Sequence, residues 1–207
     1  MKIAVIMEGS TKTRNSEVMQ AFEGMGHEVY NLGMKNEPEE PDLTYMETGL
    51  LAALLLNLGA VDFVLGGCGT GQGFMNMVLQ FPGVSCGLLC DPVDAFLFSQ
   101  VNAGNCVSLA LNKNYGNLGG GINVRYMLEK LFGDTPGQGY PPARKVIQTN
   151  AHEKLAAFSQ LAHKSMPEIL HVIDRTILQN ALGFPGILAF IAAAPESELK
   201  ACVLGMV

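Results

Sequence analysis

Five short apolar runs, separated by helical patterns, constrain the fold of this chain most strongly. They lack the alternation of half-exposed strands and are typical of parallel strands buried on both faces. We expect strands at about 2–7, 27–32, 61–65, 84–89 and 106–110. Strands that alternate with helices form a parallel sheet with helices on both faces. The sequence therefore predicts a Rossmann-like (flavodoxin-like) three-layer α/β sandwich with a five-stranded parallel sheet.

Several helices carry recognisable capping signals. Thr44 and Glu47 have the spacing of a capping box, before a long apolar helix that ends near Gly59. Asp91 and Pro92 are residue types preferred at the N-cap and the first position of a helix, here one that runs to about residue 101. Further helices are expected at about 16–25, after residue 73, and at 122–132.

A segment rich in glycine and proline, residues 133–142, ends the α/β pattern. The residues beyond it look helical, mainly at 151–164 and 167–181, but they are too few for a core of their own. We therefore expect an α/β domain over residues 1–145 and a helical C-terminal extension over 146–207. The extension should pack on the domain or on a neighbouring subunit.

The composition argues against several kinds of partner. The 207 residues include 13 Lys and Arg against 19 Asp and Glu, without a basic run, so nucleic acid and anionic membranes are poor partners. Apolar residues make up 48% and charged residues 15%, which favours an oligomer. The longest apolar runs fall far short of the roughly 20 residues of a membrane span, and the first residues lack a signal-peptide pattern. A cytoplasmic protein is expected.

The five cysteines do not predict a disulfide framework, because their number is odd and most lie in apolar or glycine-rich stretches. Four of them are most simply small apolar residues: Cys86, Cys90, Cys106 and Cys202. No histidine lies between His27 and His152 to complete a metal site around them. We expect neither a metal nor another cofactor.

Residues 66–73, Gly-Gly-Cys-Gly-Thr-Gly-Gln-Gly, are the strongest candidate for a functional site. They follow the third strand, at the end of the sheet where open α/β folds bind ligands. Alternating glycines let backbone N–H groups converge on an anion, and the next helix adds its positive end. The same dipoles would stabilise a thiolate at Cys68, which could act as a base or nucleophile. Packing and turn geometry are the alternative explanation for the glycines.

This loop, together with residues 83–92, residues 102–105 and the order of elements, resembles the type B ribose-5-phosphate isomerases and galactose-6-phosphate isomerases. The resemblance covers about residues 1–145. In that family the motif cysteine moves a proton between C1 and C2 of a sugar phosphate, while the threonine and loop amides hold the enediolate oxygens. It implies an aldose-ketose isomerase and a homodimer with shared active sites, or a tetramer. By position the roles fall on Cys68, Thr70, Gly69, Gly71 and Gly73.

The chain departs from the family pattern at several positions. Family members usually have Asp-His where Glu8-Gly9 stands here, and His-Asn-Asp where residues 101–103 are Val-Asn-Ala. The resemblance therefore implies Glu8 in place of the aspartate, and no histidine to open a sugar ring. Asn102 and Asn105 are expected to bind sugar hydroxyls, unless they only turn the backbone.

Phosphate binding is the second departure. Arg144 matches one of the family's two phosphate-binding arginines, and Tyr140 or Pro141 stands near the other. Substitutes for the missing arginine could be Arg14, Lys12, Lys35 or Arg125, although lone basic residues and Glu8 alike could be surface charges.

Two other functions remain open. Without the histidine, the chain could be a sugar-phosphate-binding protein that does not catalyse. Residues 9–16, Gly-Ser-Thr-Lys-Thr-Arg-Asn-Ser, are similar to the phosphate loop of flavodoxin-like flavin reductases, a function that would leave Cys68 without a role.

Overall fold

The computed structural model describes residues 1–113 and 120–206 and confirms the predicted fold class. Five parallel strands form one sheet in the order β2-β1-β3-β5-β4. This order exchanges the last two strands of the flavodoxin arrangement, so β5 lies between β3 and β4. The strands are β1 (Lys2–Ile6), β2 (Glu28–Asn31), β3 (Phe63–Cys68), β4 (Cys86–Leu89) and β5 (Cys106–Ala110).

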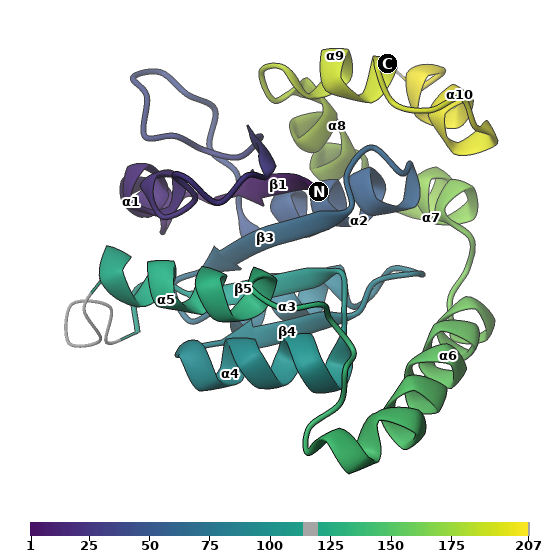
Figure 1. Ribbon diagram of the computed structural model, residues 1–207. Helices are drawn as coiled ribbons and strands as arrows, with labels where there is room; N and C mark the ends of the chain where they lie inside the picture. Colours follow the sequence, from purple (N-terminus) through teal and green to yellow (C-terminus); the bar gives the residue numbers. More distant parts are fainter. Residues whose placement is uncertain (114–119, 207) are drawn as a thin grey trace.

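Helices cover both faces of the sheet (Figure 1). One face carries α1 (Asn15–Gln20), α4 (Pro92–Leu97) and α5 (Gly121–Phe132). The other carries α2 (Tyr45–Asn57) and α3 (Gln72–Val78). Short turns of helix connect these elements: η1 (Lys12–Arg14), the π-helical turn η2 (Phe98–Asn102) that continues α4, and η3 (Pro142–Arg144).

The C-terminal extension consists of five helices. They are α6 (Lys145–Ala162), α7 (Met166–Val172), α8 (Arg175–Gly183), α9 (Ile187–Ala192) and α10 (Glu198–Leu204). Helix α8 lies against the outer side of α2, and α7, α9 and α10 contribute to the same hydrophobic core, whereas α6 runs beside η2 and has no buried residue (Figure 1). No helix of the described residues is long and apolar enough to span a membrane.

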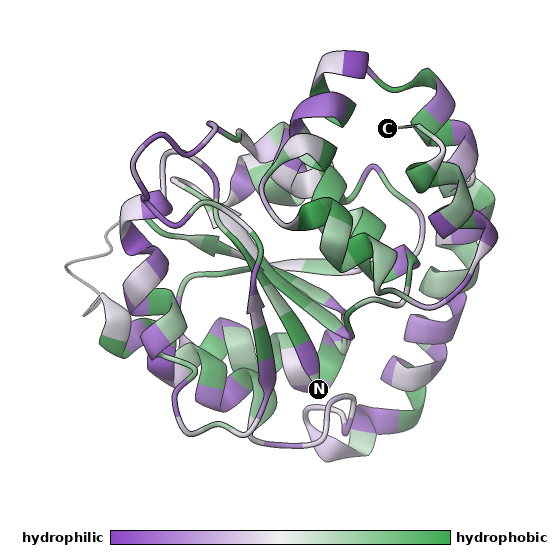
Figure 2. Cartoon of the chain, turned by 90° about the horizontal axis from the view of Figure 1, so that it is seen from above, coloured by the Kyte–Doolittle hydropathy of each residue, from purple (hydrophilic) through white to green (hydrophobic). Residues whose placement is uncertain are grey.

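Helix α2 is buried on all sides. Its residues 50–55 are completely inaccessible, because the sheet covers one side and α8 the other. Leu178, Leu182 and Ile187 of the extension belong to the same hydrophobic core as this helix. Figure 2 shows apolar residues gathered on the strands and on the helix sides that face them. Burial of apolar surface therefore ties the extension to the α/β domain.

Both capping predictions are confirmed. The Thr44 side chain accepts a hydrogen bond at the start of α2, and Glu47 accepts one from the Thr44 backbone N–H at 2.8 Å. Asp91 accepts hydrogen bonds from the N–H groups of Val93 and Asp94, at 2.8 and 3.0 Å. Each side chain satisfies N–H groups that lack a partner within the helix.

Three helix boundaries differ from the prediction. Helix α1 ends at Gln20, and two glycines with positive φ follow in the turn to β2. The helix expected over 167–181 is two helices, because Asp174 accepts hydrogen bonds from Thr176 and Ile177 and so begins a new one. Helix α6 begins at Lys145, earlier than predicted.

Strand β3 extends into the predicted glycine loop. Gly66 and Gly67 pair with β5, and Cys68 is the last residue of the strand. A Cβ atom on Gly66 would lie 2.2 Å from the ring of Phe74, and one on Gly67 would lie 2.4 Å from the Leu109 carbonyl oxygen. These two glycines therefore serve packing, whereas the residues after Cys68 form the loop.

We predict that Gly66→Ala lowers the free energy of unfolding by about 1–3 kcal/mol, the usual cost of overpacking a core. The added methyl group would overlap the Phe74 ring, which is itself fully buried. Urea denaturation measures the loss. Gly183→Ala is the matched control, because nothing lies within 4 Å of the Cβ position in this exposed residue. Equal stability of the two variants would contradict the packing role.

Candidate functional site

The carboxyl ends of the three central strands bring the candidate residues together. Glu8 follows β1, Cys68 ends β3, and Asn112 follows β5. The site lies where the connections after β1 and β3 leave neighbouring strands, a place where open α/β sheets bind ligands.

Ser10 links the three strand ends. Its hydroxyl donates to the Glu8 carboxylate and accepts from the Gly69 N–H at 3.2 Å. The Asn112 side chain donates to the Ser10 carbonyl oxygen at 2.8 Å, and the Asn112 N–H donates to the Gly69 carbonyl oxygen at 3.0 Å. Glu8 is buried, and the Thr11 hydroxyl also bonds its backbone carbonyl, at 3.2 Å. This network fixes the loop after Cys68 relative to β1.

Cys68 is 7% exposed, and its Sγ lies 4.0 Å from the Thr70 hydroxyl oxygen. Two other cysteines are in environments that disfavour the thiolate. Burial raises the pKa of the Cys106 thiol, and a hydrogen bond with Cys86 adds to the effect. Burial and then the Asp94 carboxylate raise the pKa of Cys90. These environments disfavour the thiolate, so they suit structural thiols rather than a base.

The loop amides divide into two sets. The Gly69 N–H donates to Ser10, and the Gly71 N–H donates to the Cys68 carbonyl oxygen at 3.1 Å. Within the described part of the chain, the N–H groups of Thr70 and Gly73 have no protein acceptor. Gly71 has a φ of +74°, the left-handed region that favours glycine. The two unbonded amides are therefore those that a ligand could use.

The predicted basic residues have different surroundings. Arg14 is partly buried in η1, which follows β1 at the same edge as Ser10. Lys12 pairs with Asp42 at 3.5 Å, also near this edge. Arg125 instead donates to the carbonyl oxygens of residues 21 and 23 and pairs with Glu129. It therefore holds the end of α1 against α5.

The second set of predicted residues lies at the opposite, amino end of the sheet. Asn105 immediately precedes β5 and is about 16 Å from Cys68, at about 3.3 Å per residue of strand. Asn102 ends η2, and Arg144 is exposed at the start of α6. One copy of the chain therefore does not bring these residues to Cys68.

Asn105 also has a structural role. Its side chain accepts from the Ser85 N–H and donates to the Gly83 carbonyl oxygen, each at 2.9 Å. These bonds hold the turn before β4, whereas the alternative prediction for Asn105 was a turn before the fifth strand. Asn102, in contrast, is exposed.

Three residues of the site were not predicted for it. Ser10 entered only through the flavin alternative, although its position two residues after Glu8 at a strand end was an available signal. Asn112 follows β5 at the same edge. The ring of Tyr45 lies beside Gly73, where an added Cβ would come within 3.0 Å of it, and Tyr45 is partly exposed beside the loop. Nothing in the local sequence indicated that contact.

No group of three or more His, Cys, Asp or Glu within residues 1–113 and 120–206 could hold a metal ion.

Comparisons with known proteins identify the family of the chain. The Ribose/Galactose Isomerase family model matches residues 3–148, and the chain belongs to this family. No protein among the curated ones matches.

Two solved structures resemble nearly the whole chain. A 4-deoxy-L-threo-5-hexosulose-uronate ketol-isomerase, complexed with a tartrate, is 40% identical, with a TM-score of 0.92 over 99% of this chain and 97% of its own. A ribose-5-phosphate isomerase from Vibrio parahaemolyticus is 39% identical, with a TM-score of 0.94 over 100% and 99%. The chain is thus a sugar isomerase in sequence and fold.

A type B ribose 5-phosphate isomerase from Leishmania infantum has the same fold at 19% identity, with a TM-score of 0.63. The alignment covers 78% of this chain and 97% of the Leishmania protein. The two closer structures, in contrast, span this chain almost completely, so the alignments with them include the extension.

Proposed function

We propose that this protein interconverts an aldose and a ketose through an enediolate, with Cys68 as the general base. One observation carries the proposal: a thiol at the end of the central strand lies beside the Thr70 hydroxyl and a loop with two unbonded amides. Such a group can remove a proton from carbon while neighbouring donors stabilise the resulting oxyanion. Membership of the isomerase family supports it.

The reaction is balanced without a redox partner. The thiolate of Cys68 takes the proton from C2 of the aldose, and the electrons of the C–H bond form a C1–C2 double bond. The carbonyl oxygen gains negative charge, which the Thr70 hydroxyl and the N–H groups of Thr70 and Gly73 stabilise. A proton then moves from the oxygen on C2 to the oxygen on C1, and Cys68 returns its proton to C1. Glu8 holds Ser10 and thereby the loop.

A homodimer would complete this site. Asn102 lies at the other end of the sheet, and Arg144 begins α6, the helix that runs beside η2, so in this proposal both join Cys68 from a second copy. Helix α6 exposes a row of large apolar side chains, with Phe158 65% and Leu161 84% accessible. Such a surface is unusual in a monomer and typical of an interface. The second copy would place its positive charge and amide groups opposite the Cys68 loop.

The substrate is inferred to be an acidic sugar that is open in solution. Val101 has no proton to donate to a ring oxygen, so residues 101–103 cannot catalyse ring opening. An open-chain substrate does not need that step. The uronate in the name of the 40% identical isomerase is of that kind, because a sugar deoxygenated at C4 with a carbonyl at C5 lacks the hydroxyls that close ordinary rings. A sugar phosphate is the other candidate, supported by the ribose-5-phosphate isomerase. Either anionic group could pair with Arg144 or Arg14.

The flavin alternative is weakened by the network around Ser10. Its hydroxyl is already bonded to Glu8 and Gly69, and a flavin phosphate at this loop would face the buried Glu8 carboxylate. A sugar-binding protein without catalysis would show no exchange of substrate carbon-bound protons with deuterated water, whereas the proposed isomerase incorporates deuterium.

Cys68→Ser is expected to keep the fold but lower kcat by roughly 10³-fold or more, because serine provides no comparable base near neutral pH. Isomerisation followed by NMR measures the loss. Cys202→Ser is the matched control, since Cys202 lies on α10 far from the site in sequence and structure. A Cys68→Ser variant with full activity would refute the assignment of the base.

A comparison of substrates tests the inference from Val101. Erythrose 4-phosphate cannot close a five-membered ring, because the hydroxyl that would do so carries the phosphate. Its kcat/KM should exceed that of ribose 5-phosphate by roughly 10²-fold, the lower end of what a general acid contributes. The 4-deoxy-5-hexosulose uronate belongs in the same panel. If ribose 5-phosphate is used as well or better, the preference for open chains is wrong.

Mixing two inactive variants tests the shared site. Cys68→Ser removes the base, and Arg144→Ala removes a group that the second copy would supply. After subunit exchange at equal amounts, half of the dimers should contain one intact site, which restores roughly a quarter of wild-type activity in a two-fold symmetric dimer. No restoration after demonstrated exchange, or a monomer by light scattering, would show that each copy forms its own site.

A further inference from the structure

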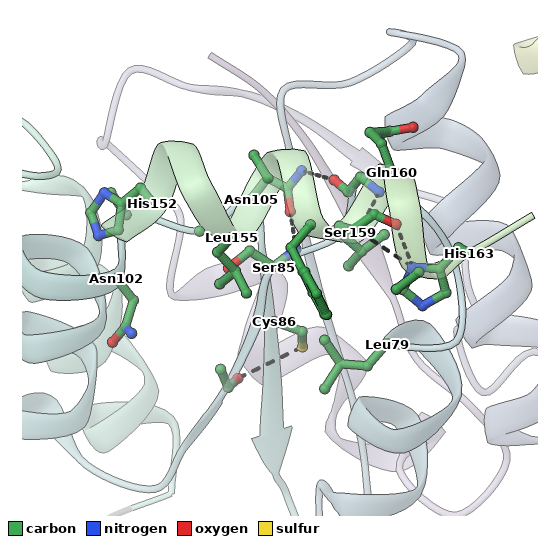
Figure 3. A pocket seen from close by; sticks show the side chains of 18 of the residues that line it. Leu79, Ser85, Cys86, Asn102, Asn105, His152, Leu155, Ser159, Gln160 and His163 are labelled. Carbon is green, nitrogen blue, oxygen red and sulfur yellow. Dashed lines mark hydrogen bonds between the residues drawn. The ribbon is translucent and has the colours of Figure 1, made fainter. Parts of the chain in front are cut away.

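A cavity of about 590 Å³ lies between the amino end of β4, η2 and α6 (Figure 3). Its lining includes Asn102 on η2 and His152 on α6, and Figure 3 shows these two side chains next to each other. Leu155 and Phe98 provide apolar walls. This cavity adjoins the face that carries the predicted sugar-binding residues and is remote from the Cys68 loop of the same copy.

The hydrogen bond of His152 defines its chemistry. The Nε2 atom bonds the carbonyl oxygen of Val101. A carbonyl oxygen can only accept, so Nε2 carries the proton, and Nδ1 is the atom that can take up and release another. The imidazole is partly exposed. A proton donor is thus fixed beside position 101, where the sequence itself has only valine.

The other three histidines are placed differently. His163 and His171 use Nδ1 to bond carbonyl oxygens of their own helices, at 2.8 and 2.7 Å. His27 packs against the ring of Phe132, and burial lowers its pKa, which disfavours a charged acid. Each of these rings keeps a second nitrogen, so position distinguishes His152: it is the histidine bonded to Val101 and next to Asn102 (Figure 3).

We propose that His152 of one copy is the general acid that opens cyclic sugars at the Cys68 site of the other copy. This inference rests on the proposed isomerase and its shared site. As the bond between C1 and the ring oxygen breaks, its electrons remain on the ring oxygen, which takes the proton from Nδ1. The proton of the C1 hydroxyl passes to water, and the free aldehyde then enters the reaction at Cys68.

The position of His152 explains how it would act across the dimer. Arg144 precedes it by two helical turns, about 12 Å along α6. One element therefore presents a positive charge for the anionic end of a sugar and an acid for its ring oxygen. Asn102 lies beside the acid and can bond a hydroxyl. His152 stands on a different element from residue 101. It would therefore accelerate ring opening less than an ideally placed acid does.

His152→Gln is the test variant, since the glutamine amide can still donate to the Val101 carbonyl oxygen but cannot titrate. We expect kcat/KM for ribose 5-phosphate to fall roughly 10- to 100-fold, up to the lower end of the usual general-acid effect, while kcat/KM for erythrose 4-phosphate stays unchanged. His163→Gln, at the residue that follows α6 and lines the same cavity, should leave both values unchanged.

Other outcomes would overturn the inference. An equal loss on both substrates would indicate a structural role, and no loss on ribose 5-phosphate would exclude ring opening by His152. A wild type that isomerises only the open-chain substrate would also exclude it. Absence of isomerisation of every sugar would instead refute the proposed function. If His152→Gln does not fold, His152→Ala with added imidazole replaces it, and recovery of activity on ribose 5-phosphate alone is the expected result.

Discussion

Parallel pairing of β3 with β1 on one side and β5 on the other fixes the residues around Cys68 relative to one another. All three strands end at one edge, and their following residues meet there through Ser10. The pairing also places the residues before β5 at the far edge, about five strand positions from Cys68. A single copy cannot bend this sheet to bring Asn102 to the thiol. The division of the predicted site into two halves follows from strand direction alone.

The backbone of the central strand also explains the glycines. A side chain at position 66 or 67 would overlap Phe74 or the backbone of β5. Most of the backbone accessible to a ligand follows Cys68, and three of the amides there, those of Gly69, Gly71 and Gln72, are already used to shape the loop. The glycine motif thus meets two requirements, close packing of the residues before Cys68 and free N–H groups in the residues after it. The sequence alone does not show which glycine meets which requirement.

Much of the fold could be predicted from local patterns. The Thr44 and Asp91 caps and the apolar runs depend on neighbouring residues, so their positions agree with the structure. The strand order depends on where β5 inserts, and the contact of Tyr45 with Gly73 depends on packing between distant segments. Neither has a local signal. The same holds for His152, which reaches Val101 across more than fifty residues.

The burial of α2 has a consequence for how the chain is made. This helix leaves the ribosome about 110 to 145 residues before the helices from Met166 to Leu204, which complete its hydrophobic core. At a synthesis rate of about 5–20 residues per second, the leucines of α2 remain without these helices for roughly 5 to 30 s. During synthesis the α/β part therefore exists with an open apolar face, a period in which chaperones protect a nascent chain from aggregation.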